Sequence, residues 1–359
     1  RQMCIRDRRH AEYYLMLAEQ AEQESGETAR LETAYNDLRA ALQWAFERGE
    51  AEMALRLSGA LCGFWCAYGY LSEGRYWLDA ALARSRSVPG AVRAKALAGA
   101  SRLAWYHGDR AAAYALLEES LAIHRTLENK PAIGNILHNL GWMALYQGDY
   151  ERAKTFYEES LAIFRKLGIK WGIAVALDGL GDVAQHQGDS TLAESFYEES
   201  LAIWRQLGYR RGIAVSLNNL GQLALAQGDS AQAAARFEES LALYRELGDN
   251  CGRADALHHL GLVALNQGND AQAAVLFEES LALYQERGDK QGMAHCLAGL
   301  AGVAAGEGQP ERAARLFGAA EALRDAIGAR MTPAERADYE RNLAAARGQL
   351  DEATFAAAW

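Results

Sequence analysis

The sequence predicts an all-α fold, a right-handed superhelical solenoid of helical hairpins with a 40-residue period. The tetrad Glu-Glu-Ser-Leu occurs five times at this spacing, first at 118–121 and last at 278–281. Half of the 359 residues are hydrophobic and only four are proline, which favours helix throughout. A fixed period of this size is typical of a solenoid, whose units bury their apolar faces only against neighbours. A glycine followed by a polar residue recurs at the same 40-residue spacing, at Gly108, Gly148, Gly188, Gly228, Gly268 and Gly308.

Two segments precede the strict repeat. Residues 1–9 differ in character from the rest of the chain, and we expect them to be a non-native or disordered lead. Residues 10–89 predict N-terminal helical hairpins that end in a degenerate repeat, because Gly69 lies 39 residues before Gly108 and Leu82 lies 39 before Leu121.

Each repeat, such as 132–167, predicts two helices. Apolar residues from Leu137 to Leu145 recur at helical spacing, and Gly148 is expected to end that helix in the left-handed conformation. Asp149 is then placed to cap the second helix, which Gly168 ends. The connection to the next unit is expected to hold a second glycine, with copies at Gly172, Gly212, Gly252 and Gly292.

This pattern resembles the tetratricopeptide repeat. In that family a small residue in the first helix lets the second helix pack closely; here it is Gly141, Gly181, Gly221, Gly261 and Ala301. The second helix has a small residue and, four later, an aromatic, as in Ala153 and Tyr157. The family's unit is about 34 residues, so the helices here are expected to be longer. The family's late proline is absent, which puts the superhelical pitch in doubt.

The repeat array is expected to cover 90–328 and to be followed by C-terminal capping helices at 329–359. Thr332 precedes Pro333, and Glu335 comes three residues after the threonine, which together predict a helix start.

The two ends of the chain resemble a narrower family, the C-terminal arm of large bacterial STAND-class regulators, signal-transduction ATPases that include LuxR-type transcriptional regulators. At the N-terminal end the resemblance rests on Leu31-Glu32-x-x-Tyr35-Asn36-Asp37-Leu38-Arg39, Phe64-Trp65 and Glu73-Gly74-Arg75-x-Trp77; at the other end it rests on 313–324, 333–336 and Phe355-Ala356-Ala357-Ala358-Trp359. It implies a sensor arm that receives an inducer or a partner protein and controls an ATPase.

The ATPase itself has no signature in this sequence. No Gly-x-x-x-x-Gly-Lys-Ser/Thr motif occurs, and Lys154-Thr155 lies inside a predicted helix. The repeat pattern predicts a protein- or ligand-binding module, and the resemblance to STAND-class regulators implies the sensor or regulatory arm of an ATP-dependent bacterial transcriptional regulator. The alternative is a stand-alone tetratricopeptide scaffold that binds extended peptides.

Charge narrows the class of partner, and cysteine content indicates the cellular compartment. The five Glu-Glu pairs carry ten charges, equal in size to the net charge of −10, and predict a solvated acidic ridge. Such a ridge argues against direct nucleic-acid contact, and no apolar run is long enough for a membrane span. Five scattered cysteines and no signal-peptide pattern indicate the cytoplasm. Cys62 and Cys66, four apart on one helix face, are interpreted as small core thiols, with a metal or redox site as the alternative.

No catalytic, cofactor or metal site is predicted, and we expect a protein that is not an enzyme. Gly179-x-Gly181-x-x-Ala184 lacks the strand that a dinucleotide fingerprint requires. His258 and His259 are expected to point apart, so with His295 they do not form a metal site.

The predicted binding surface is the concave groove lined by the first helix of each repeat. Residues at −6, −3, +1 and +5 from the packing position share a stripe that varies between repeats. A protein or peptide of mixed polarity, or a small inducer, is the expected ligand, a solvated inner face is the alternative, and the open ends allow self-association. The stripe comprises Lys95, Arg102, Tyr106, Asn135, His138, Trp142, Tyr146, Asp178, Asp182, His186, Asn218, Gln222, Asp255, His258 and Asn266.

Overall fold

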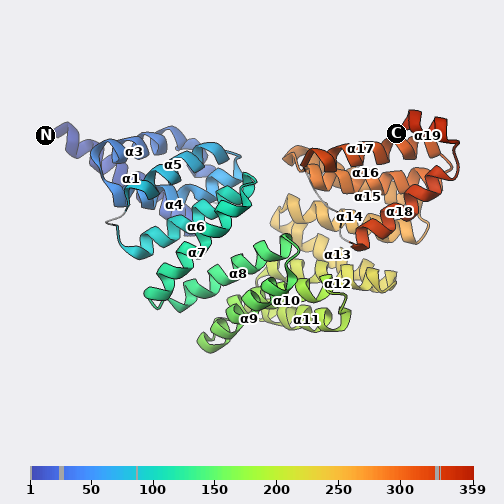
Figure 1. Cartoon of the computed structure of the whole chain (residues 1–359), viewed down its shortest axis with the longest axis horizontal. Helices are drawn as coiled ribbons and strands as arrows, with labels where there is room; N and C mark the ends of the chain where they lie inside the picture. The colour runs from blue at the N-terminus through green and yellow to red at the C-terminus, as the bar shows by residue number, and fades with distance from the viewer. Residues whose placement is uncertain (1, 24–27, 86–87, 328–330, 332) are drawn as a thin grey trace. The chain divides into compact units, whose positions relative to one another are not determined.

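The computed structural model describes residues 2–23, 28–85, 88–327, 331 and 333–359, and within these it contains helices and no strand (Figure 1). The chain divides into two compact units, unit 1 up to Gly179 and unit 2 from Leu180. The division falls inside helix α10 (Lys170–His186), within the predicted array. None of the described helices is both long and apolar enough to cross a membrane.

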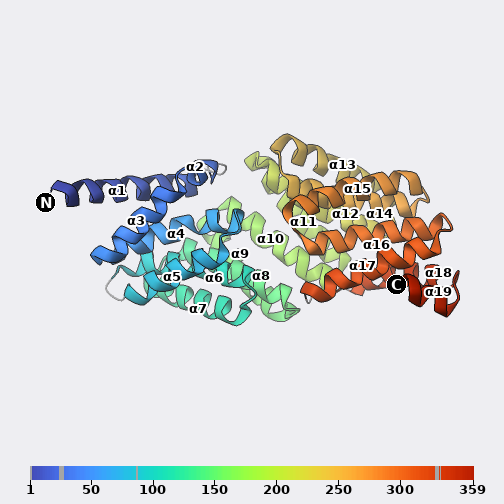
Figure 2. The same ribbon diagram turned by 90° about the horizontal axis from the view of Figure 1, so that it is seen from above.

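Unit 1 begins with five helices that precede the regular hairpins (Figure 2). Helix α1 packs on α3 and α4, and α4 packs on α5 and α6. Residues 2–9, assigned by the sequence to a lead segment, lie in the first turns of α1. The helices of unit 1 that precede α10 are α1 (Gln2–Gln23), α2 (Thr28–Thr33), α3 (Tyr35–Arg48), α4 (Ala51–Ala67), α5 (Leu71–Arg84), α6 (Gly90–Tyr106), α7 (Arg110–Thr126), α8 (Lys130–Tyr146) and α9 (Tyr150–Leu167).

Unit 2 continues the hairpins and ends with two further helices. Consecutive helices from α11 to α17 pack on one another, α18 packs on α16 and α17, and α19 packs on α17. Pro333 begins α18 as predicted, while Thr332 lies outside the described residues. After α10 come α11 (Ser190–Leu207), α12 (Arg210–Ala226), α13 (Ser230–Leu247), α14 (Asn250–Asn266), α15 (Asp270–Arg287), α16 (Lys290–Gly306), α17 (Pro310–Ile327), α18 (Pro333–Arg347) and α19 (Glu352–Ala358).

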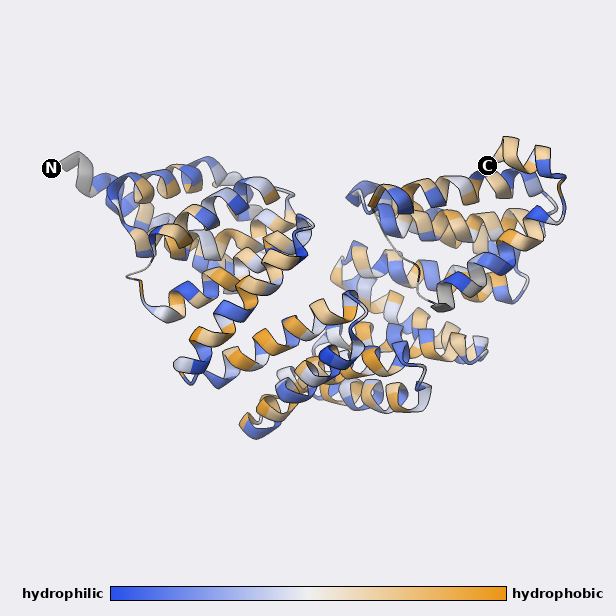
Figure 3. Ribbon diagram, viewed as in Figure 1, coloured by the Kyte–Doolittle hydropathy of each residue, from blue (hydrophilic) through white to orange (hydrophobic). Residues whose placement is uncertain are grey.

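We call the even-numbered helices α6 to α16 the A helices and the odd-numbered helices α7 to α17 the B helices. Figure 3 shows hydrophobic and hydrophilic residues side by side along each of them, as expected of amphipathic helices. The predicted helix ends are confirmed in the repeat of α8 and α9. The Asp149 carboxylate accepts from Arg152 N, Gly148 has φ 79° and Gly168 has φ 68°.

Glycines let the A helices approach the aromatic rings of the B helices. A methyl group built at Gly141 would lie 2.9 Å from the Tyr157 ring, and one at Gly261 would lie 2.6 Å from Phe277. The packing role predicted for Gly141 and its equivalents is therefore confirmed.

The second predicted loop glycine was placed wrongly. Gly172 lies inside α10, where a methyl group would come within 2.4 Å of the Phe164 ring, and Gly252 meets Tyr244 in the same way. These glycines admit the aromatic residue of the preceding B helix, and the left-handed turns fall four residues earlier, at positions such as Gly168.

The repeated tetrad joins neighbouring helices through its serine. Ser120, Ser160, Ser240 and Ser280 are fully buried, and each hydroxyl donates to a carbonyl of the preceding A helix, for example Ser160 Oγ to Gly134 O at 2.9 Å. The second glutamate of the tetrad pairs with an arginine, as in Arg125–Glu159 and Arg205–Glu239. The predicted acidic ridge is thus exposed, and part of its charge is paired between repeats.

Candidate functional site: the A-helix faces

The predicted groove residues fall into two sets, which we name the unit 1 face and the unit 2 face. The division assigns eight residues to the first and seven to the second. The unit 1 face comprises Lys95, Arg102, Tyr106, Asn135, His138, Trp142, Tyr146 and Asp178, and the unit 2 face comprises Asp182, His186, Asn218, Gln222, Asp255, His258 and Asn266.

An aromatic cluster forms part of the unit 1 face. The ring centroids of Trp142 and Tyr146 are 4.6 Å apart, and Trp105 of α6 lies 4.9 Å from Trp142. The Arg110 guanidinium sits 5.4 Å from the centre of the Trp105 ring. Tyr106 and Tyr146 are more than half exposed, as expected, whereas Trp142 is half-buried because it packs between the rings of Trp105 and Tyr146. The cluster offers flat apolar surface beside a cation, a combination suited to anchoring a partner.

His138 lies one turn before Trp142 on the same helix. Its ring is 5.4 Å from the Tyr157 ring, and its Nδ1 is buried without a hydrogen-bond partner. Burial lowers the pKa of His138 to about 4, so the imidazole is neutral at pH 7.

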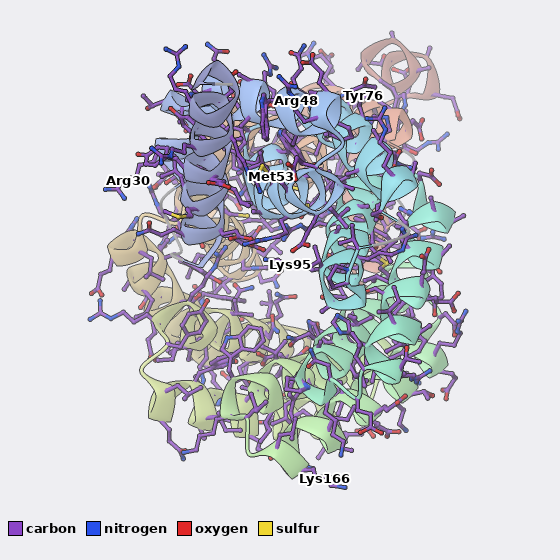
Figure 4. All side chains as sticks on the ribbon, turned by 90° about the vertical axis from the view of Figure 1, so that its left-hand side faces the viewer. Arg30, Arg48, Met53, Tyr76, Lys95 and Lys166 are labelled. Atoms are coloured by element: carbon purple, nitrogen blue, oxygen red, sulfur yellow. The ribbon has the colours of Figure 1, made fainter. Side chains whose placement is uncertain are left out.

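The basic residues of the unit 1 face are held by different neighbours. The Lys95 ammonium pairs with Glu22 of α1 at 2.6 Å, and Figure 4 shows Lys95 on the other side of unit 1 from Arg48 and Tyr76. Arg102 is exposed and lies beside Cys62 and Cys66 of α4. Asn135 is exposed and Asp178 is half-buried.

The unit 2 face is polar and is linked by hydrogen bonds across α10, α12 and α14. Asp182 Oδ1 accepts from the Tyr197 hydroxyl at 2.7 Å and lies 3.4 Å from Asn219 Nδ2. One residue before Asn219, Asn218 Oδ1 lies 3.3 Å from His259 Nδ1, which donates when it carries the proton. Neighbouring side chains therefore fix the positions of both amides, but Asn218 is buried and only Asn219 is partly accessible.

A histidine cluster continues this polar set onto α16. The ring centroids of His258 and His259 are 5.4 Å apart, and those of His258 and His295 are 5.8 Å apart. The two adjacent rings were expected to point apart; they lie close together, although each packs beside a different B-helix phenylalanine, His258 beside Phe277 and His259 beside Phe237. Burial first, and then the neighbouring imidazoles, lower the pKa of His258 well below its usual value.

Asp255 completes the inner part of the unit 2 face. Its carboxylate accepts from the Tyr284 hydroxyl, and burial raises the pKa of this carboxyl group. Gln222 is half-buried, whereas His186 and Asn266 are exposed near the ends of their helices.

The sequence reasoning missed Trp105 and Arg110 on the unit 1 face and Asn219 on the unit 2 face, and it considered His259 and His295 only as metal ligands. Asn219 and His259 stand two residues before the packing glycine, so a stripe one residue wider would have included both. Trp105 lies on the same helix as Arg102 and Tyr106, which the predicted stripe included. It stands four residues after buried Ser101, outside the positions that defined the stripe.

Hydrogen bonding and ring stacking are the chemistry that the two faces offer. Across the described parts of the chain, no three His, Cys, Asp or Glu side chains gather as metal ligands would. The groups present donate and accept hydrogen bonds or stack on rings, and such groups bind extended chains as well as small polar molecules.

Comparison with known proteins identifies the repeats. Two family models, both described as tetratricopeptide repeat, match residues 106–166 and 172–246, and residues 253–287. A relative described as an HTH-type transcriptional regulator of Mycobacterium tuberculosis (strain ATCC 25618 / H37Rv) is 36% identical over 104 residues. The match spans 26% of this chain and only 12% of that regulator.

Two solved structures share the fold at low sequence identity. One is the Rap conjugation gene regulator of the plasmid pLS20 in complex with the Phr* peptide, with a TM-score of 0.62 and 13% identity, covering 77% of this chain and 75% of that one. The other is a STAND protein with a tetratricopeptide repeat sensor from Pyrococcus horikoshii, with a TM-score of 0.61 and 14% identity, covering 95% of this chain and 52% of that one.

The family models, the packing glycines and the paired helices agree on one conclusion. Residues 106–166, 172–246 and 253–287 are tetratricopeptide repeats, and the chain is similar in fold to a STAND protein with a tetratricopeptide repeat sensor and in part of its sequence to a transcriptional regulator.

Proposed function

We propose that the A-helix faces bind a protein or peptide, and that the chain is the sensor arm of an ATP-dependent transcriptional regulator. Tetratricopeptide repeats form a helical-repeat module whose general role is protein binding. One observation carries the proposal: the packing residues stay constant from repeat to repeat, while the residues of the A-helix faces change. Hairpin packing does not require that variation, so recognition of a ligand is its natural explanation.

The chemistry of the faces favours a peptide of mixed polarity. On the unit 1 face, the aromatic cluster with Arg110 suits an aromatic or acidic side chain of the peptide. On the unit 2 face, the half-buried amide of Asn219 suits hydrogen bonding to a peptide backbone, whereas Asn218 is buried and contacts His259. The structural neighbour in complex with the Phr* peptide supports this class of ligand.

The regulatory role is supported by two of the comparisons. The matching relative is described as a transcriptional regulator, and a STAND protein carries a sensor of the same fold. The gene sequence on both sides of this chain tests the role. A phosphate-loop ATPase in the same reading frame supports the sensor arm, whereas an independent gene without one would favour the stand-alone scaffold.

Binding is tested by selecting a phage-displayed library of random linear peptides against the immobilised full chain. We expect enriched peptides whose affinity falls at least about tenfold in the Trp142→Ala/Tyr146→Ala or the Asn218→Ala/Asn219→Ala variant, because each removes the core of one face. Val275→Ala is the matched control, since Val275 is 63% exposed on the B helix α15. Failure to enrich any peptide, or equal loss in the control, would refute the peptide proposal.

A further inference from the structure

A groove of about 600 Å³ in unit 2 is lined by residues of α17, α18 and α19 and by Met331 (Figure 1). The residues that α18 contributes are spaced three and four apart, so they form one stripe of the helix. A helix usually packs such a stripe against a neighbouring helix, whereas here the stripe faces the groove. It comprises Arg336, Tyr339, Glu340, Leu343 and Arg347.

The other walls of the groove are held in place by contacts within unit 2. The Tyr339 hydroxyl donates to Glu321 Oε2 of α17 at 2.8 Å. The ring centroids of Phe355 and Trp359 in α19 are 5.3 Å apart, and Trp359 is 42% exposed. A methyl group built at Gly318 would lie 2.5 Å from Trp359 O, so α19 lies directly on α17. A surface that is fixed in this way loses little conformational freedom when it binds a partner.

We propose that this groove is the interface of a symmetric dimer, in which α18 packs antiparallel against α18 of a second copy of the chain, about a two-fold axis at Leu343. The groove lies outside the A-helix faces, so the proposal does not depend on the peptide or the regulatory role proposed above.

The order of charges along α18 favours a second copy as the partner. Glu340 stands three residues before Leu343 and Arg347 stands four residues after it, and both are exposed. In an antiparallel pair of identical helices, positions before the centre face positions after the centre. Each Glu340 therefore lies opposite Arg347 of the partner subunit, and the symmetry forms this ion pair twice.

Arg347 is available for this exchange of partners. Within its own chain it pairs with Glu352 at 2.6 Å, and both side chains are more than half exposed. Solvent screens such a pair, so replacing Glu352 by another carboxylate costs little.

The remaining charges of the groove argue against a ligand of one sign. Its lining carries two arginines and three glutamates, so a purely acidic or purely basic ligand would meet like charges. The same mixed surface in the reverse direction meets opposite charges instead. A two-fold contact between identical surfaces also closes on itself, so it gives a dimer and no larger assembly.

Sedimentation velocity of the purified full chain tests the proposal. We expect a shift from monomer to dimer as the concentration rises from about 1 to 100 μM, because an interface of this size is a small one. A chain that stays monomeric over this range would overturn the proposal, and so would a series of species larger than the dimer.

Charge reversal on α18 tests which surface forms the dimer. Glu340→Arg and Arg347→Glu each place like charges opposite one another, so each should weaken the dimer at least about tenfold. An equimolar mixture of the two variants should dimerise again, because one carries only arginine and the other only glutamate at these two positions. The double variant Glu340→Arg/Arg347→Glu should also dimerise with itself. Recovery in either case shows that the single variants are folded.

Arg341→Glu is the matched control, since it reverses a charge on the same helix at an exposed residue that does not line the groove. We expect it to leave the dimer unchanged. Equal weakening by Arg341→Glu and Arg347→Glu, a dimer that neither groove variant weakens, or no recovery in both the mixture and the double variant would each contradict the proposed interface.

Discussion

Helix α8 of unit 1 and helix α14 of unit 2 occupy equivalent places in the repeat but present different chemistry. Both place a glycine against a B-helix ring, Gly141 against Tyr157 and Gly261 against Phe277. One residue after the glycine, α8 has Trp142 in an aromatic cluster, whereas α14 has Leu262. Packing positions therefore fix the hairpin, while the positions next to them remain available for recognition.

The two helices share a histidine three residues before that glycine, in different surroundings. The His138 ring packs at a tilt beside the Tyr157 ring, and its Nδ1 is buried without a hydrogen-bond partner. His258 contacts His259 and His295, with Cys296 Sγ 3.9 Å from its Nδ1. The histidine at this position thus contacts no other histidine in unit 1, whereas in unit 2 it belongs to a histidine cluster. Three tests measure how far the units differ.

Lowering the pH should cause the largest change in the free energy of unfolding. The pKa of His138 falls from about 6.5 in the unfolded chain to about 4 in the folded one, so between these pH values the unfolded state binds more protons. The stability contribution is complete above pH 6.5 and is lost as the pH falls to 4, by on the order of 3 kcal/mol. Burial lowers the pKa of His258 in the same direction, so its protonation should also reduce stability as the pH falls, and urea denaturation followed by circular dichroism at several pH values measures the sum.

Single variants assign this loss to the two units. His138→Phe and His258→Phe keep a ring in place and cannot titrate, so each should flatten the dependence of stability on pH in this window. Curves parallel to that of the unmodified chain would show that neither buried histidine controls acid stability.

Replacing equivalent packing glycines by alanine should lower the free energy of unfolding by the next largest amount. The loss should be equal in the two units. In Gly172→Ala and Gly252→Ala the new methyl group would meet Phe164 at 2.4 Å and Tyr244 at 2.2 Å. Overpacking should destabilise each by about 2 kcal/mol, after allowing for the helix propensity gained.

Gly63→Ala of α4 is the control for these glycines, because a methyl group there meets only Arg102, at 3.8 Å. It should stabilise the chain slightly, and thermal unfolding measures all three variants. A stable Gly252→Ala variant would mean that the hairpins do not pack as closely as described.

Removing an ion pair of the exposed acidic ridge should change the free energy of unfolding least, in either unit. Arg125 pairs with Glu159 in unit 1 and Arg205 pairs with Glu239 in unit 2, and all four side chains are about half exposed. Solvent screens such pairs, so Arg125→Gln and Arg205→Gln should each change the unfolding free energy by less than about 1 kcal/mol. A larger change in denaturant titrations, especially one that persists in high salt, would point to a structural role for the ridge.

The sequence predicted the repeat more accurately than the site. Asp149, Gly141 and Gly168 were assigned their roles correctly, because caps and close helix contacts depend on local residue type. Gly172 was placed in a loop because a glycine inside a helix looks the same in sequence as a glycine that ends one. The clustering of Trp105 with Trp142 was not predicted, since their rings come from different repeats.

The order of amino acids is sufficient to specify the hairpins: a 40-residue rhythm of glycine, capping aspartate and apolar stripes leaves the backbone few alternatives. Packing between helices settles which groups of different helices meet, as with His259 and Asn218 or Arg102 and the α4 thiols. The physical reason is that caps and stripes act within a few residues, whereas the distance between side chains of separate helices depends on how those helices pack.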